Sequence, residues 1–370
     1  MKAIAFIRRH YDPFGGAENY IDSLINNLPG YKIHMLSSRW KENPRIVQHT
    51  VNSASVSSAY SAIKFNRNAA AIIRQITPNC TVSFERTTCQ DIYRAGDGCH
   101  RQWLMIRRLL CGRLKGLSFH FNLLHRTLLS LEKELFRATP VIIANSNMVK
   151  QNIIEHYAVN EDKIHVLYNG VDLTRFNTGC RERLSAEFRR EFHVKDDTAM
   201  LLFVGSGFER KGLGVLIEAM SQIRTPAVLY VAGRGRTGKY EAACQRLGVR
   251  DRVVFTGPAL NIERFYAASD VFILPTLYDP FSNATLEAMA SGAAVITSRN
   301  NGASEIIEDG RDGVLLNDMT DPEELAAKID KTIPICGELG CRATQKALAY
   351  SISCAAGQFS CLIEDYCLNK

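Results

Sequence analysis

The stretch Met200–Gly212, MLLFVGSGFERKG, joins a short apolar run to a glycine-rich loop and two adjacent cations. The apolar run predicts a buried β-strand, and glycines directly after a strand let the backbone approach a ligand closely. Arg210 and Lys211 precede a predicted helix, so two cations lie beside the positive end of the helix dipole. This combination predicts a diphosphate site, and the alternative is a solvated turn with surface charges.

The alternation of apolar runs and helical patterns continues in both directions along the chain. The predicted strands span residues 3–9, 32–36, 46–51, 81–84, 141–145 and 163–167, then 200–205, 227–233, 253–257, 271–275, 294–297 and 313–316. The helices predicted with them span residues 16–27, 61–76, 147–157, 213–223, 262–268, 283–291 and 322–329. Such alternation builds parallel sheets covered by helices.

The sequence therefore predicts an α/β protein with two Rossmann-like, doubly wound parallel-sheet domains. The first domain is expected over residues 1–172 and the second over residues 173–345. The remaining residues, 346–370, are predicted to be helical, and they either close the second domain or cross back to the first. Ligands of such sheets bind at the carboxyl ends of the strands, so the loops after the strands are where functional residues are expected.

A second motif follows the predicted strand at residues 271–275. It is Tyr278–Glu287, YDPFSNATLE, with two acidic residues, Asp279 in the loop and Glu287 one turn inside the next helix. Ser282 or Asn283 can cap that helix, which leaves the N–H groups of Ala284 and Thr285 for a phosphate. Glu287 would then accept hydrogen bonds from ribose hydroxyls. The alternative is an ordinary capped helix with one surface acid.

Composition fits a globular protein of this size. Of the 370 residues, 46% are hydrophobic and 22% are charged. No apolar run reaches the roughly 20 residues of a bilayer-spanning helix, and the opening residues, MKAIAFIRRH, show no small-residue cleavage site. The eleven cysteines form no Cys-x-x-Cys pair. We therefore expect reduced thiols in a cytoplasmic protein, and no metal site.

The two halves of the chain differ in charge. Residues 1–170 carry 22 Lys and Arg against 12 Asp and Glu, whereas residues 171–370 carry 23 against 26. The basic half suggests an anionic partner. Residues 101–137 concentrate eight Lys or Arg among bulky apolar residues, a pattern typical of segments that lie on anionic membranes. The alternative is a helical excursion packed on its own domain, and no recognition motif supports nucleic acid.

One further glycine motif is similar to those of dinucleotide-binding proteins. Gly233–Gly238, GRGRTG, follows a predicted strand and fits the glycine pattern of dinucleotide sites. Such a site needs an acidic residue about 20 residues later, at the end of the next strand. That strand ends in Thr256 and Gly257, so we expect a backbone contact to a nucleotide and no hydride transfer.

Together these motifs resemble the retaining glycosyltransferase family 4, whose GT-B fold has two Rossmann-like domains facing each other across a cleft. The resemblance also rests on Phe14–Glu18, FGGAE, which is similar to the acceptor-side glycine loop of the family, and on Ala144–Ser146, Val166–Asp172 and Phe176. The motifs occur in the order and at the spacing of the family. One position departs from it, because the first acid of the paired motif is usually Glu and here is Asp279.

The resemblance implies roles for individual residues. It makes Arg210 and Lys211 the ligands of the donor diphosphate and Glu287 the ligand of the ribose, and it places Asp279 at the sugar. The implied donor-binding residues are Gly15, Gly16, Arg175, Gly205, Arg210, Lys211, Asn283, Ala284, Thr285 and Glu287. The implied catalytic residues are Asp97, Arg210, Lys211 and Asp279.

Within that family, Tyr11–Gly16 and Arg94–Gly98 are most similar to the lipopolysaccharide core glucosyltransferase I group. This makes Glu18, Arg94 and His100 acceptor-side candidates beside Asp97, which can reach the acceptor hydroxyl. For His100 a surface or packing role is the alternative.

The implied function is metal-independent and cofactor-free transfer of a hexose, with glucose favoured, from a UDP-sugar to a lipopolysaccharide core or similar lipid-linked anionic glycan. The enzyme would retain the anomeric configuration. It would be cytoplasmic and peripheral on the inner face of a bacterial inner membrane, docked through residues 101–137. The alternatives are a nucleotide-sugar epimerase or hydrolase of the same fold and a donor-binding protein without catalysis.

Overall fold

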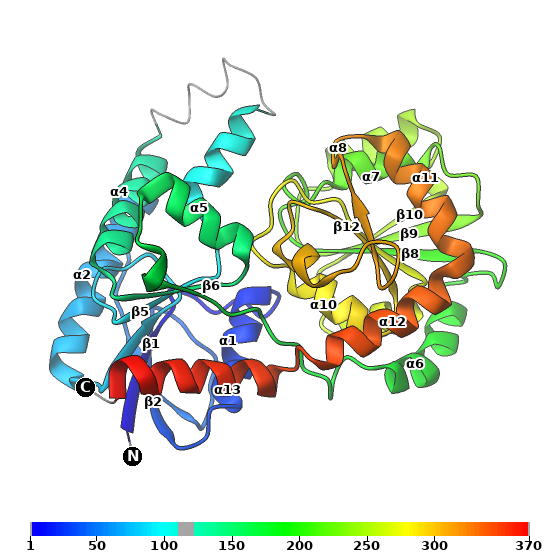
Figure 1. Cartoon of the computed structure of the whole chain (residues 1–370). Helices are drawn as coiled ribbons and strands as arrows, with labels where there is room; N and C mark the ends of the chain where they lie inside the picture. Colours follow the sequence, from blue (N-terminus) through cyan, green and yellow to red (C-terminus); the bar gives the residue numbers. More distant parts are fainter. Residues whose placement is uncertain (1, 110–121, 369–370) are drawn as a thin grey trace. The chain divides into compact units, whose positions relative to one another are not determined.

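The computed structural model describes residues 2–109 and 122–368. The chain forms two compact units, one of Met1–Tyr168 with Ala355–Lys370 and the other of Asn169–Cys354. Each unit is built on one parallel sheet covered by helices (Figure 1). The prediction of two doubly wound, Rossmann-like domains is confirmed.

The first unit contains a seven-stranded sheet in the order β3-β2-β1-β4-β5-β6-β7. Its strands are β1 (Lys2–Ile7), β2 (Tyr31–Ser37), β3 (Ile46–Thr50), β4 (Cys80–Ser83), β5 (Ile92–Ala95), β6 (Val141–Ala144) and β7 (Ile164–Val166). Its helices include α1 (Gly16–Asn26), α2 (Ser58–Ile76), α4 (Leu123–Ala138) and α5 (Asn147–Tyr157). The strand order reverses between β1 and β4, so the loops after these two strands lie side by side.

The second unit contains a six-stranded sheet in the order β10-β9-β8-β11-β12-β13. Its strands are β8 (Ala199–Val204), β9 (Ala227–Ala232), β10 (Val253–Gly257), β11 (Val271–Leu274), β12 (Ala294–Ser298) and β13 (Val314–Leu316). Its helices include α6 (Thr178–Glu191), α7 (Leu213–Met220), α8 (Gly238–Arg246), α9 (Ile262–Ala268), α10 (Asn283–Ala290), α11 (Pro322–Thr332) and α12 (Cys336–Leu348). Here the order reverses between β8 and β11.

Local chemistry sets the helix starts. The Ser57 hydroxyl accepts a hydrogen bond from the third residue of α2, and the Ser146 hydroxyl does the same for α5. Asp321 caps α11, whose first residue is Pro322. These residues satisfy N–H groups that have no intrahelical acceptor, and proline at the first helical position loses nothing because its missing N–H would be unpaired there.

The last helix returns to the first unit. In α13 (Ile352–Ile363), the ring of Phe359 lies 6.1 Å from that of Phe6 and 6.5 Å from that of Phe84. The Tyr31 hydroxyl donates to Glu364 Oε1 at 2.7 Å. The red helix of Figure 1 therefore completes the core of the unit that the first strand begins.

Some elements carry a weak sequence signal and were not predicted. β5 has four residues, IYRA, with an arginine among them, so no apolar run marks it. Helix α6 buries only Cys180 and Phe188 among its charged residues, so it has no clear apolar stripe. Helix α8 was also missed, whereas α4 lies largely within residues 101–137, where a helical excursion packed on its own domain was the alternative to a membrane segment.

The predicted interfacial segment, residues 101–137, divides into three parts. Residues 100–109 are helical, residues 110–121 lie outside the described residues, and α4 follows. Helix α4 buries Leu135 and Phe136 in the core of the first unit, which narrows the segment available to a membrane. No helix in the described part of the chain is both long enough and apolar enough to span a bilayer.

Candidate functional site

The predicted diphosphate motifs meet at the carboxyl edge of the second sheet. β8 pairs with β11 where the strand order reverses, so the loops after these strands are neighbours. The backbone N–H of Leu277, after β11, donates to the carbonyl of Arg210, after β8, at 2.8 Å. The topology thus brings Arg210 and Lys211 beside Asp279.

Glycines allow this close approach. Gly212 has a φ of 79°, and a Cβ atom there would lie 2.0 Å from the carbonyl oxygen of Pro275. A Cβ atom at Gly233, after β9, would lie 2.1 Å from the carbonyl oxygen of Gly205. The GRGRTG loop therefore packs on the diphosphate loop through its backbone. Its first glycine has a steric role that needs no dinucleotide.

A buried ion pair lies at the centre of the site. The ammonium group of Lys211 contacts Asp279 Oδ2, and Arg210 Nη1 lies 3.6 Å from the same oxygen. Burial raises the pKa of Asp279, but Lys211 and Arg210 hold it below its ordinary value. Burial lowers the pKa of Lys211, Asp279 opposes this shift and Arg210 adds to it. Asp279 is therefore the ionised counter-charge of both cations.

A buried asparagine that the sequence analysis missed holds the loop that carries Asp279. Asn301, at 0% exposure, accepts from the N–H of Ser282 at 3.1 Å and donates to the Thr285 hydroxyl at 3.0 Å. The N–H of Gly302 also donates to the carbonyl of Asp279 at 2.8 Å. The available signal was the position of Asn301, in the loop that follows β12 at the carboxyl edge of the sheet.

The start of α10 follows this loop. The Ser282 hydroxyl accepts from the N–H of Thr285 at 3.3 Å. This corrects the expectation that Thr285 offers its N–H to a phosphate, because the helix cap already uses that group. Asn283 Oδ1 accepts from Asn169 at 2.6 Å. Of the two N–H groups predicted for a phosphate, the prediction now rests on that of Ala284.

Glu287 lies one turn inside α10. The Tyr266 hydroxyl donates to its Oε2 at 2.9 Å. Burial raises the pKa of Glu287, while Tyr266 and Arg175 oppose the shift. Arg175 itself binds Glu263 of α9 through Nε at 3.0 Å and Nη2 at 2.8 Å. A carboxylate with one such donor keeps lone pairs for further hydroxyl groups.

The acceptor-side candidates Glu18 and Asp97 lie at the carboxyl edge of the sheet of the first unit. Arg8, after β1, binds Glu18 of α1 at 2.7 Å and Asp97, after β5, at 2.8 Å. A Cβ atom at Gly15 would lie 1.9 Å from Glu18 Oε2, so the glycine loop closes over this carboxylate. Gly16 begins α1. Arg8 thereby connects Glu18 to Asp97, two candidates that are far apart in sequence.

Two other acceptor-side candidates have different surroundings. Arg94 is 1% exposed, and its guanidinium lies 4.8 Å from the centre of the Tyr20 ring. This corrects the expectation that Arg94 faces the acceptor, because a strand residue inside the sheet points into the core. His100 Nε2 lies 3.2 Å from His125 Nδ1, and burial, with a contribution from Arg86, lowers the pKa of His100 to about 4.

Two further charged residues extend this cluster, and the sequence analysis missed both. Arg86 Nε lies 3.2 Å from Glu132 Oε1, and its Nη1 lies 4.0 Å from Asp97 Oδ2. Burial opposes the charge of Arg86, yet Tyr93, Glu132 and Asp97 raise its pKa. A lone arginine and a lone glutamate 46 residues apart form no local motif, so no sequence pattern marks the pair.

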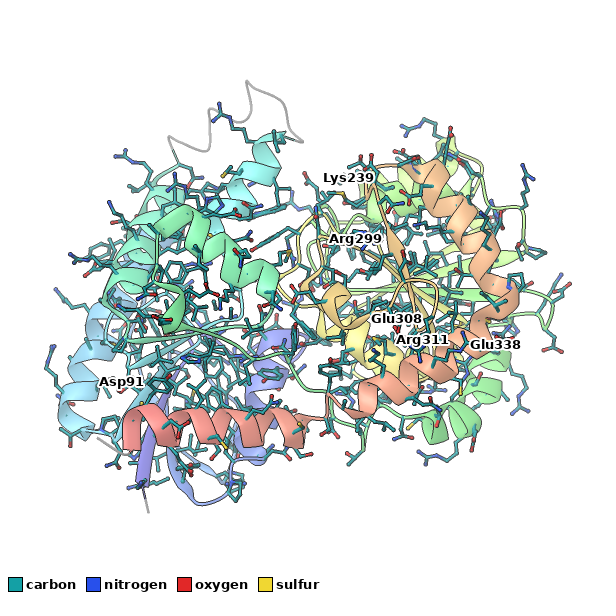
Figure 2. The ribbon with its side chains drawn as sticks, in the orientation of Figure 1. Asp91, Lys239, Arg299, Glu308, Arg311 and Glu338 are labelled. Atoms are coloured by element: carbon teal, nitrogen blue, oxygen red, sulfur yellow. The ribbon has the colours of Figure 1, made fainter. Side chains whose placement is uncertain are left out.

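Potential metal ligands converge elsewhere. Within residues 2–109 and 122–368, a single group of three qualifies: Cys80, Asp91 and Cys367, with ligand atoms within 4.8 Å of one another. Cys80 begins β4 and Asp91, labelled in Figure 2, precedes β5. This group therefore lies at the amino edge of the first sheet, away from the candidate residues.

Two family descriptions match the chain. "Glycosyltransferase Family 4" matches residues 14–175, and "Glycosyl transferases group 1" matches residues 198–333. The first match covers most of the first unit, and the second lies within the second unit.

The chain is 22% identical over 346 residues to the lipopolysaccharide glucosyltransferase WaaG of Escherichia coli, and this match covers 89% of each chain. It is 35% identical over 197 residues to an uncharacterized glycosyltransferase of Methanocaldococcus jannaschii, covering 52% of this chain and 50% of that protein. Matches to several other curated relatives likewise span about half of those proteins.

Solved structures share the fold. The crystal structure of WaaG superposes with a TM-score of 0.85 over 97% of this chain and 99% of that chain, at 21% identity. Anabaena HepE in complex with UDP-glucose superposes with a TM-score of 0.75 over 99% of this chain and 100% of that chain, at 18% identity.

Proposed function

Because the chain belongs to the GT-B glycosyltransferases, with a family 4 domain followed by a group 1 domain, we propose that it transfers a hexose from a UDP-sugar to a lipid-linked anionic glycan. The observation that carries this proposal is the meeting of Arg210 and Lys211 with Asp279, in the loop that leads to α10, at one sheet edge. Glucose and a lipopolysaccharide-type core are favoured, because WaaG is a lipopolysaccharide glucosyltransferase and HepE binds UDP-glucose.

The proposed reaction breaks the bond between the anomeric carbon and the diphosphate and joins that carbon to an acceptor oxygen. Negative charge develops on the departing UDP. Arg210, Lys211 and the N–H groups at the start of α10 would stabilise this charge without a metal ion. Lys211 would turn from Asp279 towards the diphosphate. The acceptor hydroxyl would attack from the face that UDP leaves, so the anomeric configuration would be retained. The hydroxyl would pass its proton to a phosphate oxygen of the departing UDP.

The remaining candidates take supporting roles. Glu287 would accept hydrogen bonds from ribose hydroxyls beside Tyr266. In the first unit, Asp97 would accept a hydrogen bond from the acceptor, held in place by Arg8. His100 would contribute as a neutral imidazole, because its pKa of about 4 keeps it uncharged near neutral pH.

We also propose that the helix at residues 100–109 and the segment after it dock on the inner face of a bacterial membrane. Leu109 is 83% exposed and Leu123 is 63% exposed, on either side of residues 110–121. Arg107 and Arg108 lie beside Leu109 on the helix at residues 100–109. Apolar side chains beside cations favour binding to anionic lipid.

The test of function is a donor panel of UDP-sugars, each incubated with and without truncated lipopolysaccharide core. Transfer of one hexose to the core, with UDP released, is the expected result. An epimerised or free sugar without acceptor would replace the proposal with an epimerase or hydrolase, and binding without turnover would leave a donor-binding protein. Activity is expected to survive EDTA, and a loss that manganese restores would refute metal independence.

Membrane docking has its own test. We expect the protein to sediment with anionic vesicles and to be released as salt rises, because the Debye length is about 8 Å at physiological ionic strength. Replacing Arg107, Arg108, Arg113 and Lys115 with Gln should abolish binding and spare turnover on a soluble acceptor; Arg113 and Lys115 lie outside the described residues. Equal binding to neutral vesicles would refute this part of the proposal.

A further inference from the structure

The most deeply buried carboxylate of the acceptor-side cluster is one for which the proposed reaction has no use. Glu132 lies in the middle of α4 with 0% of its surface exposed. Its oxygens accept from Arg86 Nε at 3.2 Å, the backbone N–H of His100 at 2.8 Å and the Tyr157 hydroxyl at 2.6 Å. A buried charge is tolerated only with partners of this kind. The chain segments that carry Arg86, His100 and Tyr157 are therefore all held by the Glu132 side chain.

Glu132 caps a helix to which it does not belong. Helical structure begins at His100, and the N–H groups of His100 and Arg101 donate to Glu132 at 2.8 Å and 3.3 Å. Groups at a helix start lack intrahelical acceptors, and a negative charge there also interacts favourably with the helix dipole. Glu132 therefore fixes where the helix at residues 100–109 begins.

The same carboxylate reaches Asp97 through one arginine. Arg86 contacts Glu132 through Nε at 3.2 Å, donates to the carbonyl of Gly98 at 3.5 Å and lies 4.0 Å from Asp97. Asp97 in turn binds Arg8. Opposite charges thus alternate from Glu132 to Arg8 across the carboxyl edge of the sheet, and each orients the next.

We propose that Glu132 is a positioning residue for the acceptor: it holds the helix at residues 100–109 and the Asp97 loop as one rigid part of the acceptor site. This inference rests on the proposed function. It assigns acceptor recognition to a residue that never touches the acceptor, and it joins the acceptor site to the helix proposed to lie at the membrane.

The decisive variant is Glu132→Gln, which keeps the size of the side chain and removes its charge. We expect the KM for the acceptor to rise about tenfold, which corresponds to about 1.4 kcal/mol, while the Kd of the donor stays unchanged. Hydrogen exchange at residues 100–109 should accelerate. Glu134→Gln is the matched control, because Glu134 lies on the same helix and is exposed. Glu132→Asp, which keeps the charge, should recover part of the acceptor affinity.

A double-mutant cycle tests the route through Arg86. If Arg86 transmits the effect, Arg86→Gln with Glu132→Gln should raise the acceptor KM no more than the larger single effect. If Glu132→Gln is poorly folded, Arg86→Gln alone serves, with the same split between acceptor KM and donor Kd expected. An unchanged acceptor KM, or an equal loss of donor affinity, would overturn the inference. Wild-type protein that transfers no sugar would instead refute the proposed function, and the hydrogen-exchange result would still report on the cap.

Discussion

The carboxyl edges of the two sheets carry the two candidate sites, and they are built in different ways. In the first unit, Arg8, Glu18, Arg86, Asp97 and Glu132 come from separate segments and pair through their side chains. In the second unit, glycines let loops touch through their backbones. Lys211 and Asp279 form the central ion pair, and each of them belongs to a short sequence motif.

A short sequence motif can encode a site of the second kind. A site of the first kind exists only once distant residues have been brought together by folding. A nucleoside diphosphate is the same ligand in many enzymes, and a glycine loop beside a helix start suffices to hold it. The proposed acceptor side instead relies on pairs between residues that are distant in the sequence. Substitutions at the carboxyl edge of the second sheet should therefore change donor binding. Substitutions at the carboxyl edge of the first sheet should change the positions of several chain segments together.

The largest effect is expected at the two donor-side cations. Lys211→Ala and Arg210→Ala should each lower kcat about 100-fold or more with saturating donor, the range for loss of one preorganised charge donor. Steady-state kinetics measures this. Lys331→Ala is the control, because Lys331 is an exposed lysine of the same unit in the last turn of α11. Near-normal kcat in both site variants would remove these residues from the site.

The backbone contact of the second edge is tested by a pair of glycines. Gly212→Ala places a side chain at a φ of 79° and against Pro275, and a non-glycine residue in such a conformation costs about 1–3 kcal/mol before any clash. Gly214→Ala, in the first turn of α7, meets no atom within 4 Å and should be neutral or stabilising. Urea unfolding of both variants decides, and equal stability would contradict the steric role.

A smaller effect is expected at Glu287, the proposed ligand of the ribose. Glu287→Gln should raise the Kd of the donor about tenfold, or about 1.4 kcal/mol, because an amide accepts hydrogen bonds less strongly than a carboxylate. Isothermal titration with UDP measures the change. Tyr266→Phe removes only the hydroxyl that orients Glu287 and should have a lesser effect. An unchanged Kd in Glu287→Gln would place the ribose elsewhere.

The smallest effect concerns pH and the first edge. The pKa of His100 is lowered from 6.5 to about 4 in the folded protein, so the unfolded chain binds the proton more readily. The contribution of neutral His100 to the free energy of unfolding is complete above about pH 6.5 and is lost as the pH falls towards 4. His100→Gln should therefore flatten the decline in unfolding free energy between pH 6.5 and pH 5. An identical slope in both proteins would show that His100 does not contribute.

The sequence predicted most of the fold, because short apolar runs and capped helices are local signals. It placed Arg210, Lys211 and Asp279 in loops after strands, and the structure brings them together. It mistook Arg94 for an accessible residue, since the short strand β5 was not recognised as part of a buried sheet. It also missed Glu132, whose partners lie far from it in the sequence and exist only once the chain has folded.

The return of α13 to the first unit has a consequence for synthesis. Domains generally fold in the order in which the ribosome releases them. The second unit is one continuous stretch, Asn169–Cys354. The first unit lacks Phe359, which packs on Phe6 and Phe84, until α13 has emerged. The half of the protein that is translated first is therefore completed last, when α13 has been synthesised.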